Sequence, residues 1–139
     1  MGTDFGARYL QIGQVAERTE LSLKTIRHYD EVGLVQPSAR SAGGFRLYTE
    51  ADVDRLLVIR RMKPLGFTLA EMKSLLDAVD ILDDRTTTTA ERTEARAFLR
   101  ECGAKAGDSA ERLRRQLAYA EEFAELLAAR TRVPTADQD

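Results

Sequence analysis

The sequence is poor in the residues that build catalytic and metal centres. Its 139 residues include one cysteine, one histidine and no tryptophan. A single cysteine excludes an intramolecular disulfide. One histidine and one cysteine leave no His/Cys metal cluster and no evident nucleophile–base pair. The composition therefore predicts a protein that is not an enzyme and that holds no metal or other cofactor.

Long apolar runs are also missing. No apolar stretch approaches the ~20 residues that a membrane-spanning helix needs. The first ten residues, MGTDFGARYL, lack the apolar core of a signal peptide. Apolar residues make up 43% of the chain and charged residues 32%, which is typical of a globular domain with a modest core. With its single unpaired cysteine, the chain is predicted to be cytoplasmic and to have no membrane partner.

Charge is unevenly distributed along the chain. The net charge is −2, but residues 8–65 carry 10 Lys or Arg against 7 Asp or Glu, whereas residues 66–139 carry 11 against 15. A basic first half beside an acidic second half favours a polyanionic partner for the first half only. A positive excess of three charges does not by itself identify the partner, so the sequence motifs are needed as well.

Two short helices are predicted near the start of the chain. The run IGQVAERT at 12–19 has an apolar side and predicts the first. Ser22 can cap a second helix, from Leu23 to about Val32, and Gly33 can end it in a left-handed conformation. Two helices joined by a tight polar turn are a candidate helix-turn-helix.

The second of these helices has two different sides. Its inner side is predicted to bury Leu23, Ile26 and part of Tyr29. Its outer side is a stripe of hydrogen-bond donors, made of Lys24, Arg27 and His28 with Thr25 beside them. Donors without acidic partners suit the phosphates and base edges of a DNA major groove. The alternative is an ordinary solvated helix face. The segment that follows helps to choose between these two interpretations.

The run RSAGGFRLY at 40–48 predicts a β-hairpin. Gly43 and Gly44 can supply the positive φ angles of a tight turn. Alternation beyond the turn predicts an apolar face and a donor face. The apolar face consists of Phe45 and Leu47, and the donors are Arg40, Arg46 and Tyr48. A hairpin after a helix-turn-helix is a wing whose donors would contact backbone phosphates; a hairpin that only covers the core would not explain them.

Two further helices complete the first half. Thr49 with Asp52, and Thr68 with Glu71, form capping-box pairs that predict where each helix begins. The polar run DILDDRTTTT then breaks the helical pattern. We therefore expect a DNA-binding domain over residues 9–80 and a linker over 81–90.

Residues 91–131 predict one long helix with coiled-coil periodicity. Its seam alternates in steps of four and three and consists of Leu99, Gly103, Ala106, Ala110, Leu113, Leu117, Ala120, Ala124 and Leu127. Such a helix spans roughly 60 Å, too long to fold back onto so small a domain. A second copy of the chain is therefore expected to cover the seam, with all of these residues except Gly103 as dimerisation contacts. Residues 132–139 are predicted to form a short disordered tail.

Taken together, these motifs resemble the MerR family of bacterial transcriptional regulators. The resemblance covers residues 9–79, in IGQVAERTELSLKTIRHYDEVGLV, GGFRLYTEADVDRL and LGFTLAEMKSLL, and the long helix matches in position and period. It implies a mainly α-helical homodimer with winged helix-turn-helix heads and long helices that pair as an antiparallel coiled coil. It also implies binding to a pseudo-palindromic promoter, control of transcription by DNA distortion, and RNA polymerase as a candidate partner.

The resemblance also implies DNA-contacting residues by position. On the recognition helix these are Lys24, Thr25, Arg27 and His28; on the wing they are Arg40, Gly44, Arg46 and Tyr48; and Tyr29 and Arg60 match positions that touch phosphate. The alternatives are an architectural or excisionase-like DNA-bending factor, and a protein-interaction module.

The inducing signal is not identified by the sequence. Metal-sensing relatives carry cysteines at the start of the long helix and in a loop after it, where this chain has threonines 86–89 and RTRVPTADQD. Drug-binding relatives append a separate ligand domain. Cys102 lies off the seam, where it is either a small buried apolar residue or a redox-sensitive thiol.

Overall fold

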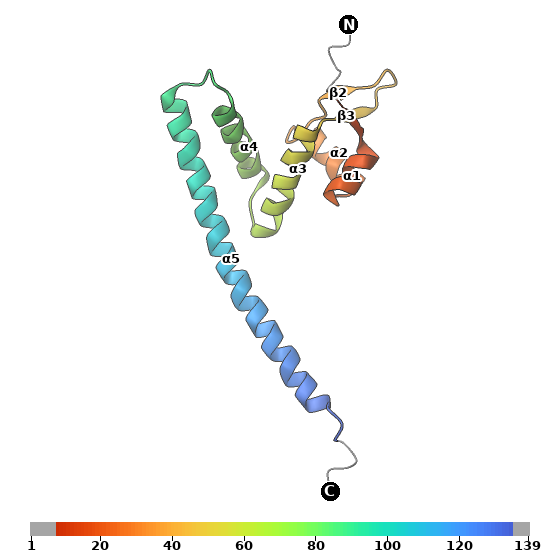
Figure 1. Cartoon of the computed structure of the whole chain (residues 1–139), viewed down its shortest axis with the longest axis vertical. Helices are drawn as coiled ribbons and strands as arrows, with labels where there is room; N and C mark the ends of the chain where they lie inside the picture. Colours follow the sequence, from red (N-terminus) through yellow and green to blue (C-terminus); the bar gives the residue numbers. More distant parts are fainter. Residues whose placement is uncertain (1–7, 135–139) are drawn as a thin grey trace. The chain divides into compact units, whose positions relative to one another are not determined.

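The computed structural model describes residues 8–134, which form a mainly helical fold with one small sheet, as predicted (Figure 1). In chain order the elements are β1 (Leu10–Gln11), α1 (Ile12–Thr19), α2 (Leu23–Glu31), β2 (Ala39–Arg40), β3 (Arg46–Tyr48), α3 (Glu50–Met62), the 3₁₀ turn η1 (Lys63–Leu65), α4 (Leu69–Asp83) and α5 (Thr89–Thr131). The chain divides into two compact units, one ending at Arg100 and one starting at Glu101.

The helix-turn-helix in the first unit forms as its local sequence dictates. Before α1, the Gln11 amide donates a hydrogen bond to Oε1 of Gln14 at 2.8 Å. The Ser22 hydroxyl accepts a hydrogen bond from the Thr25 amide at 3.0 Å, which confirms Ser22 as the cap of α2. Leu23 is 40% exposed, so the prediction that it is buried was wrong. It occupies the first position of α2, at the margin of the core.

The sheet contains one strand that the sequence did not predict. Its order is β1-β3-β2, and both pairs are antiparallel. Strand β1 spans only two residues, too few to show an alternating pattern. In the hairpin turn Gly44 alone of the two adjacent glycines has a positive φ, +83°, whereas both were predicted to have one. The Gly44 amide donates to the Ser41 carbonyl at 2.9 Å and closes the turn.

Two residues of the hairpin are placed differently from the prediction. Tyr48 is fully buried, whereas Phe45, just before the strand, is 72% exposed. Arg46 lies on the same face of the strand as Tyr48, and its Nε donates to Oδ2 of Asp30 at 2.7 Å. The donor face can therefore turn inward because α2 supplies a carboxylate for the arginine and the core takes the tyrosine ring.

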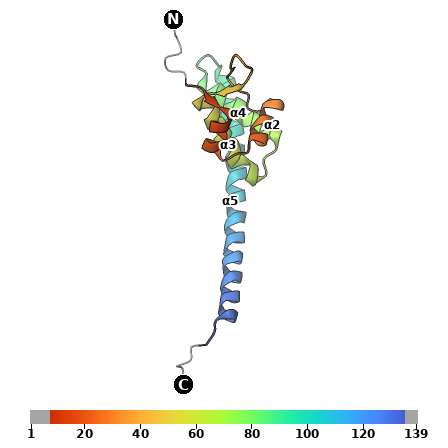
Figure 2. The same cartoon turned by 90° about the vertical axis from the view of Figure 1, so that its right-hand side faces the viewer.

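A single apolar core fixes the helix-turn-helix and the hairpin. Its buried side chains are Val15, Ile26, Tyr29, Leu34, Val35, Tyr48, Val53, Leu56, Ile59 and Met62. Helix α1 packs against both α2 and α3, and Figure 2 shows the short helices gathered around this region. The buried Thr19 hydroxyl donates to the Val15 carbonyl at 2.8 Å. The orientation of α2 is thus set by its neighbours as well as by its own sequence.

Helices α3 and α4 begin at the predicted capping boxes. Thr49 pairs reciprocally with Asp52, and Thr68 with Glu71. Arg55 Nη1 donates to Oδ1 of Asp80 at 2.6 Å and links the two helices. The irregular segment after α4 covers residues 84–88 and is shorter than the linker expected over 81–90. Among residues 8–134 no helix combines the length and apolar character needed to cross a membrane.

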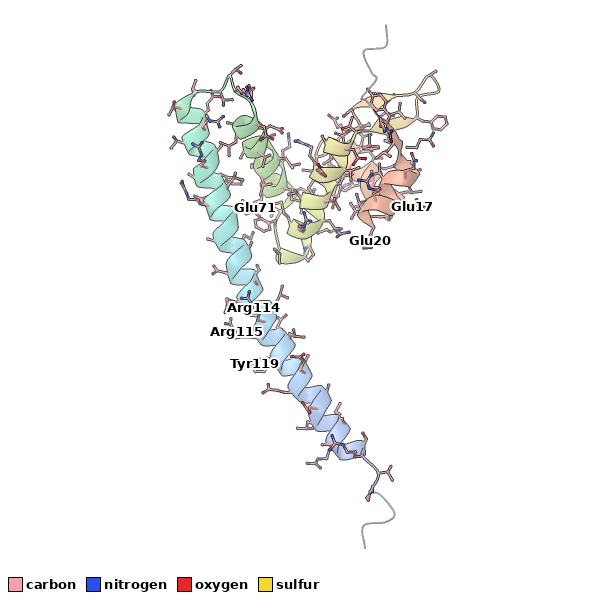
Figure 3. The ribbon with its side chains drawn as sticks, viewed as in Figure 1. Glu17, Glu20, Glu71, Arg114, Arg115 and Tyr119 are labelled. Atoms are coloured by element: carbon pink, nitrogen blue, oxygen red, sulfur yellow. The ribbon has the colours of Figure 1, made fainter. Side chains whose placement is uncertain are left out.

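The second unit is the continuation of α5 from Glu101 to Thr131. Helical structure runs without interruption through Gly103. Figure 3 shows Arg114, Arg115 and Tyr119 projecting from this helix. Its exposed large apolar side chains are Leu113, Leu117, Tyr119, Phe123, Leu126 and Leu127. The tail expected over 132–139 falls largely on 135–139, which lie outside the described residues.

Candidate DNA-binding surface

The outer side of α2 carries the predicted donors. Lys24, Arg27 and His28 are exposed and Thr25 is partly buried, while Ile26 and Tyr29 on the inner side are buried. Within residues 8–134 none of the three exposed side chains forms an ion pair. The stripe is therefore available to a ligand outside the molecule.

A hollow of about 300 Å³ lies next to this stripe. It is lined by Gln11, Ile12, Gly13, Arg27, Gly44, Phe45 and Arg46. Arg27 comes from α2 and Arg46 from the wing, so two elements direct cationic side chains to one hollow. Paired guanidinium groups bind phosphate through charge-assisted hydrogen bonds. The exposed Phe45 at its edge was missed, because strand alternation had assigned it to the core.

The wing arginines are held by α2. Arg46 Nε and Arg40 Nη2 donate to the same oxygen of Asp30, Oδ2, at 2.7 and 3.3 Å. The hydrogen bond from Arg46 to Asp30 raises the pKa of Arg46 above its usual value. Arg40 Nη1 also donates to the Gly44 carbonyl at 3.1 Å and braces the turn. Asp30 was missed because no sequence pattern links it to a hairpin ten or more residues away.

A second cationic hollow, of about 510 Å³, lies on the other side of α2. Its lining residues are Leu21, Thr25, Tyr29, Arg60, Lys63 and Pro64. Arg60 Nη1 donates to the Thr19 carbonyl at 2.8 Å, which fixes this arginine beside the helix-turn-helix. Tyr29 lines the hollow but is almost fully buried, and burial raises its pKa. Lys63 was missed because it lies in the turn after α3, where no helical period marks it.

Tyr48 does not reach the surface, which contradicts its expected phosphate contact. Its hydroxyl is buried and has no hydrogen-bond partner among the described residues. Burial raises its pKa, so the hydroxyl stays neutral at physiological pH. Tyr48 is thus a core residue of the wing.

Replacing Tyr48 by Phe should therefore leave DNA affinity unchanged. Removing an unpaired buried hydroxyl is expected to keep the free energy of unfolding constant or raise it by about 1 kcal/mol. Urea denaturation and fluorescence anisotropy with labelled DNA measure the two quantities. Weaker DNA binding by a variant of unchanged stability would return Tyr48 to the binding surface.

The remaining candidate residues lie on α5. Leu99, Ala106 and Ala110 are partly buried, while Leu113, Leu117, Ala120, Ala124 and Leu127 are exposed. Cys102 is buried, which favours a small apolar role; the redox switch stays a prediction. Within residues 8–134 no group of three or more His, Cys, Asp or Glu side chains is placed to hold a metal ion.

A helix-turn-helix followed by a hairpin, with cationic side chains around its second helix, defines a winged helix-turn-helix protein. Residues 10–79 match the family described as MerR HTH family regulatory protein, and residues 53–119 match that described as MerR, DNA binding. The chain belongs to the MerR family of helix-turn-helix regulators, which confirms the resemblance drawn from its motifs.

Individual relatives agree with this assignment. The chain is 40% identical over 96 residues to the HTH-type transcriptional regulator CueR of Vibrio cholerae, covering 69% of this chain and 68% of CueR. It is 46% identical over 67 residues to the HTH-type transcriptional activator Mta of Bacillus subtilis, covering 48% of this chain but only 26% of Mta. These relatives are transcriptional regulators, in agreement with the prediction that the chain is not an enzyme.

A solved structure shares the fold. It is that of HiNmlR, a MerR family regulator lacking the sensor domain, bound to promoter DNA. The TM-score is 0.68, and the match covers 89% of this chain and 95% of HiNmlR. At 21% identity this likeness concerns the fold alone.

Proposed function

We propose that the protein is a homodimeric, sequence-specific transcriptional regulator that binds a pseudo-palindromic promoter. The observation that carries this proposal is the unpaired donor stripe of Lys24, Arg27 and His28 on α2, flanked by two cationic hollows. In the proposed complex α2 lies in the major groove, where its stripe and Thr25 contact base edges. The outlying cations Arg40, Arg46, Arg60 and Lys63 contact phosphates on either side.

A second copy of the chain is proposed to cover the seam of α5. Leu113 and Leu117 are 49% and 59% exposed in the single chain. Fully burying a leucine side chain contributes about 1.5–3 kcal/mol, so a seam of such residues can drive association. Because the DNA-binding elements precede α5 in sequence, antiparallel pairing would place the two heads at opposite ends of the paired helices. This arrangement matches two half-sites related by a two-fold axis.

The proposed mechanism is distortion of the bound promoter. Bending a site of this kind costs on the order of a few kcal/mol. A change in the distance or angle between the two heads would determine whether binding provides this free energy. RNA polymerase is the proposed partner that reads the distorted DNA in the cytoplasm. We retain residues 9–80 as the DNA-binding domain, 81–90 as a linker and 91–131 as the dimerisation helix; the effector is not identified.

An architectural or excisionase-like factor is the runner-up. The family match that extends to residue 119, into α5, favours a regulator, because a factor that only bends DNA needs no long dimerisation helix. Transcription in vitro from the fragment upstream of its own gene separates the two. A change in transcript yield supports the regulator, and DNA bending without such a change supports the architectural factor.

The docking arrangement predicts different consequences for two arginines. Arg46→Ala should weaken binding to every duplex and reduce the slope of log affinity against log salt by about one, because a phosphate contact is lost. Arg27→Ala should cost about 1–3 kcal/mol on the promoter fragment and reduce its preference over a scrambled duplex more than Arg46→Ala does. Anisotropy titrations at several salt concentrations measure both effects.

Arg85→Ala is the control for these variants. It removes one exposed positive charge from the segment between α4 and α5, away from the recognition helix in sequence and outside both hollows. It should leave the preference for the promoter fragment unchanged. Equal salt slopes and unchanged selectivity in Arg27→Ala and Arg46→Ala would refute the docking arrangement.

A further inference from the structure

An acidic side chain lies within the proposed DNA-binding surface. Asp30 belongs to α2, the helix with the donor stripe, and its side chain is 10% exposed. A carboxylate near the phosphates of DNA is repelled by them and so opposes binding. A carboxylate at this position is therefore expected to make contacts that offset its repulsion of DNA.

The contacts of Asp30 connect the recognition helix to the wing at two points. Its Oδ2 accepts hydrogen bonds from Arg46 Nε on β3 and Arg40 Nη2 on β2. Through Arg40 Nη1 the connection continues to the carbonyl of Gly44 at the hairpin turn. No other element of the described chain ion-pairs with these two arginines. Asp30 therefore links α2 directly to both strands of the hairpin.

The arginines keep donors for a ligand while they are held. Arg46 uses only Nε on Asp30, so both terminal nitrogens of its guanidinium form no hydrogen bond within residues 8–134. Its side chain is still 23% exposed, and that of Arg40 is 51% exposed. A guanidinium held at Nε has fewer rotamers to lose when it binds phosphate.

We propose that Asp30 is a positioning residue for DNA recognition, which holds the two wing arginines in register with the donor stripe of α2. This inference rests on the proposed DNA-binding function. Binding to an arbitrary duplex needs only positive charge, but binding to the promoter needs phosphate contacts and base contacts to form together. Loss of Asp30 should therefore act in opposite directions on the two kinds of binding.

The test compares Asp30→Asn with Glu31→Gln. Both variants remove one negative charge from the end of α2, but Glu31 is exposed and forms no ion pair among the described residues. Anisotropy titrations use the full chain with the fragment upstream of its own gene and with a scrambled duplex. Both variants should bind the scrambled duplex more tightly than the wild type. Asp30→Asn alone should lower the ratio of promoter to scrambled affinity, by about tenfold.

A double-mutant cycle separates positioning from a general structural role. With Arg40 and Arg46 both replaced by Ala, Asp30→Asn should not lower the ratio of promoter to scrambled affinity any further, because the partners of Asp30 are gone. Asp30→Glu, which keeps the charge but moves the carboxylate, should lower the ratio without tightening scrambled binding. If Asp30 only stabilised the fold, the effect of Asp30→Asn on the affinity ratio would not depend on whether Arg40 and Arg46 are present.

Three outcomes would overturn the inference, and one concerns the proposed function instead. If Asp30→Asn behaves like Glu31→Gln, Asp30 does not position the wing. If it lowers both affinities in parallel or unfolds the protein, as circular dichroism would report, Asp30 is a stability residue. A further loss in the double-alanine background would also contradict it. A wild-type protein with no preference for the promoter fragment would instead count against the proposed function.

Discussion

Replacing Leu113 and Leu117 together by Asp is expected to convert the protein to a monomer and to weaken promoter binding by at least about a hundredfold. Both side chains lie on the seam of α5 and are half exposed in the single chain. Two aspartates would place unpaired charges in the interface that the proposed dimer buries, and burying an unpaired charge opposes association. A monomer loses the second head, whose tethering typically contributes a factor of about 10²–10⁴ to affinity.

Sedimentation equilibrium and anisotropy together measure this prediction. Arg115→Asp is the matched control, because it changes the net charge as much as the two seam substitutions together and lies on the side of the helix opposite the seam. The control should remain a dimer and bind the promoter fragment nearly as the wild type does. On a duplex with a single half-site, the seam variant should bind about as well as the wild type. A seam variant that stays dimeric, or binds the full promoter undiminished, would contradict the proposed interface.

Helices were predicted well because their signals are local. The first turn of α2 depends on Ser22 and Thr25, which are neighbours in sequence, and α3 begins at its own Thr49–Asp52 pair. The donor stripe followed from helical spacing alone. Such features need no knowledge of what packs against the helix.

Features that depend on distant partners were not predictable in the same way. Alternation gives the period of β3 but not which face is buried. On the face that carries Arg46 and Tyr48, the arginine finds its partner in Asp30, sixteen residues away in sequence. Tyr48 was therefore assigned to the surface although it is buried, and Phe45 to the core although it is exposed. Lys63 was not predicted as a site residue, because it reaches the hollow beside Arg60 only in the folded chain.

The head itself should depend strongly on Leu56, the fully buried leucine of α3. Leu56→Ala is expected to lower the free energy of unfolding by about 2–5 kcal/mol, the sum of lost apolar burial and the cavity left behind. That is a large part of the roughly 5–15 kcal/mol that stabilises a typical domain. Because α1 packs directly on α3, the loss should destabilise the helix-turn-helix as a whole.

Urea denaturation at one fixed protein concentration measures this effect, since association would otherwise shift the midpoint. Leu69→Ala is the control, because Leu69 is a half-exposed leucine of the same unit and its loss should change stability by about 0.5 kcal/mol or less. Well below its unfolding midpoint, Leu56→Ala should still prefer the promoter fragment, because Leu56 is enclosed in the core and contributes no donor to the surface. If promoter preference disappears while the head remains folded, recognition depends on core packing more directly than the donor stripe implies. If stability is unchanged, the core is not organised around α3 as the burial of Leu56 indicates.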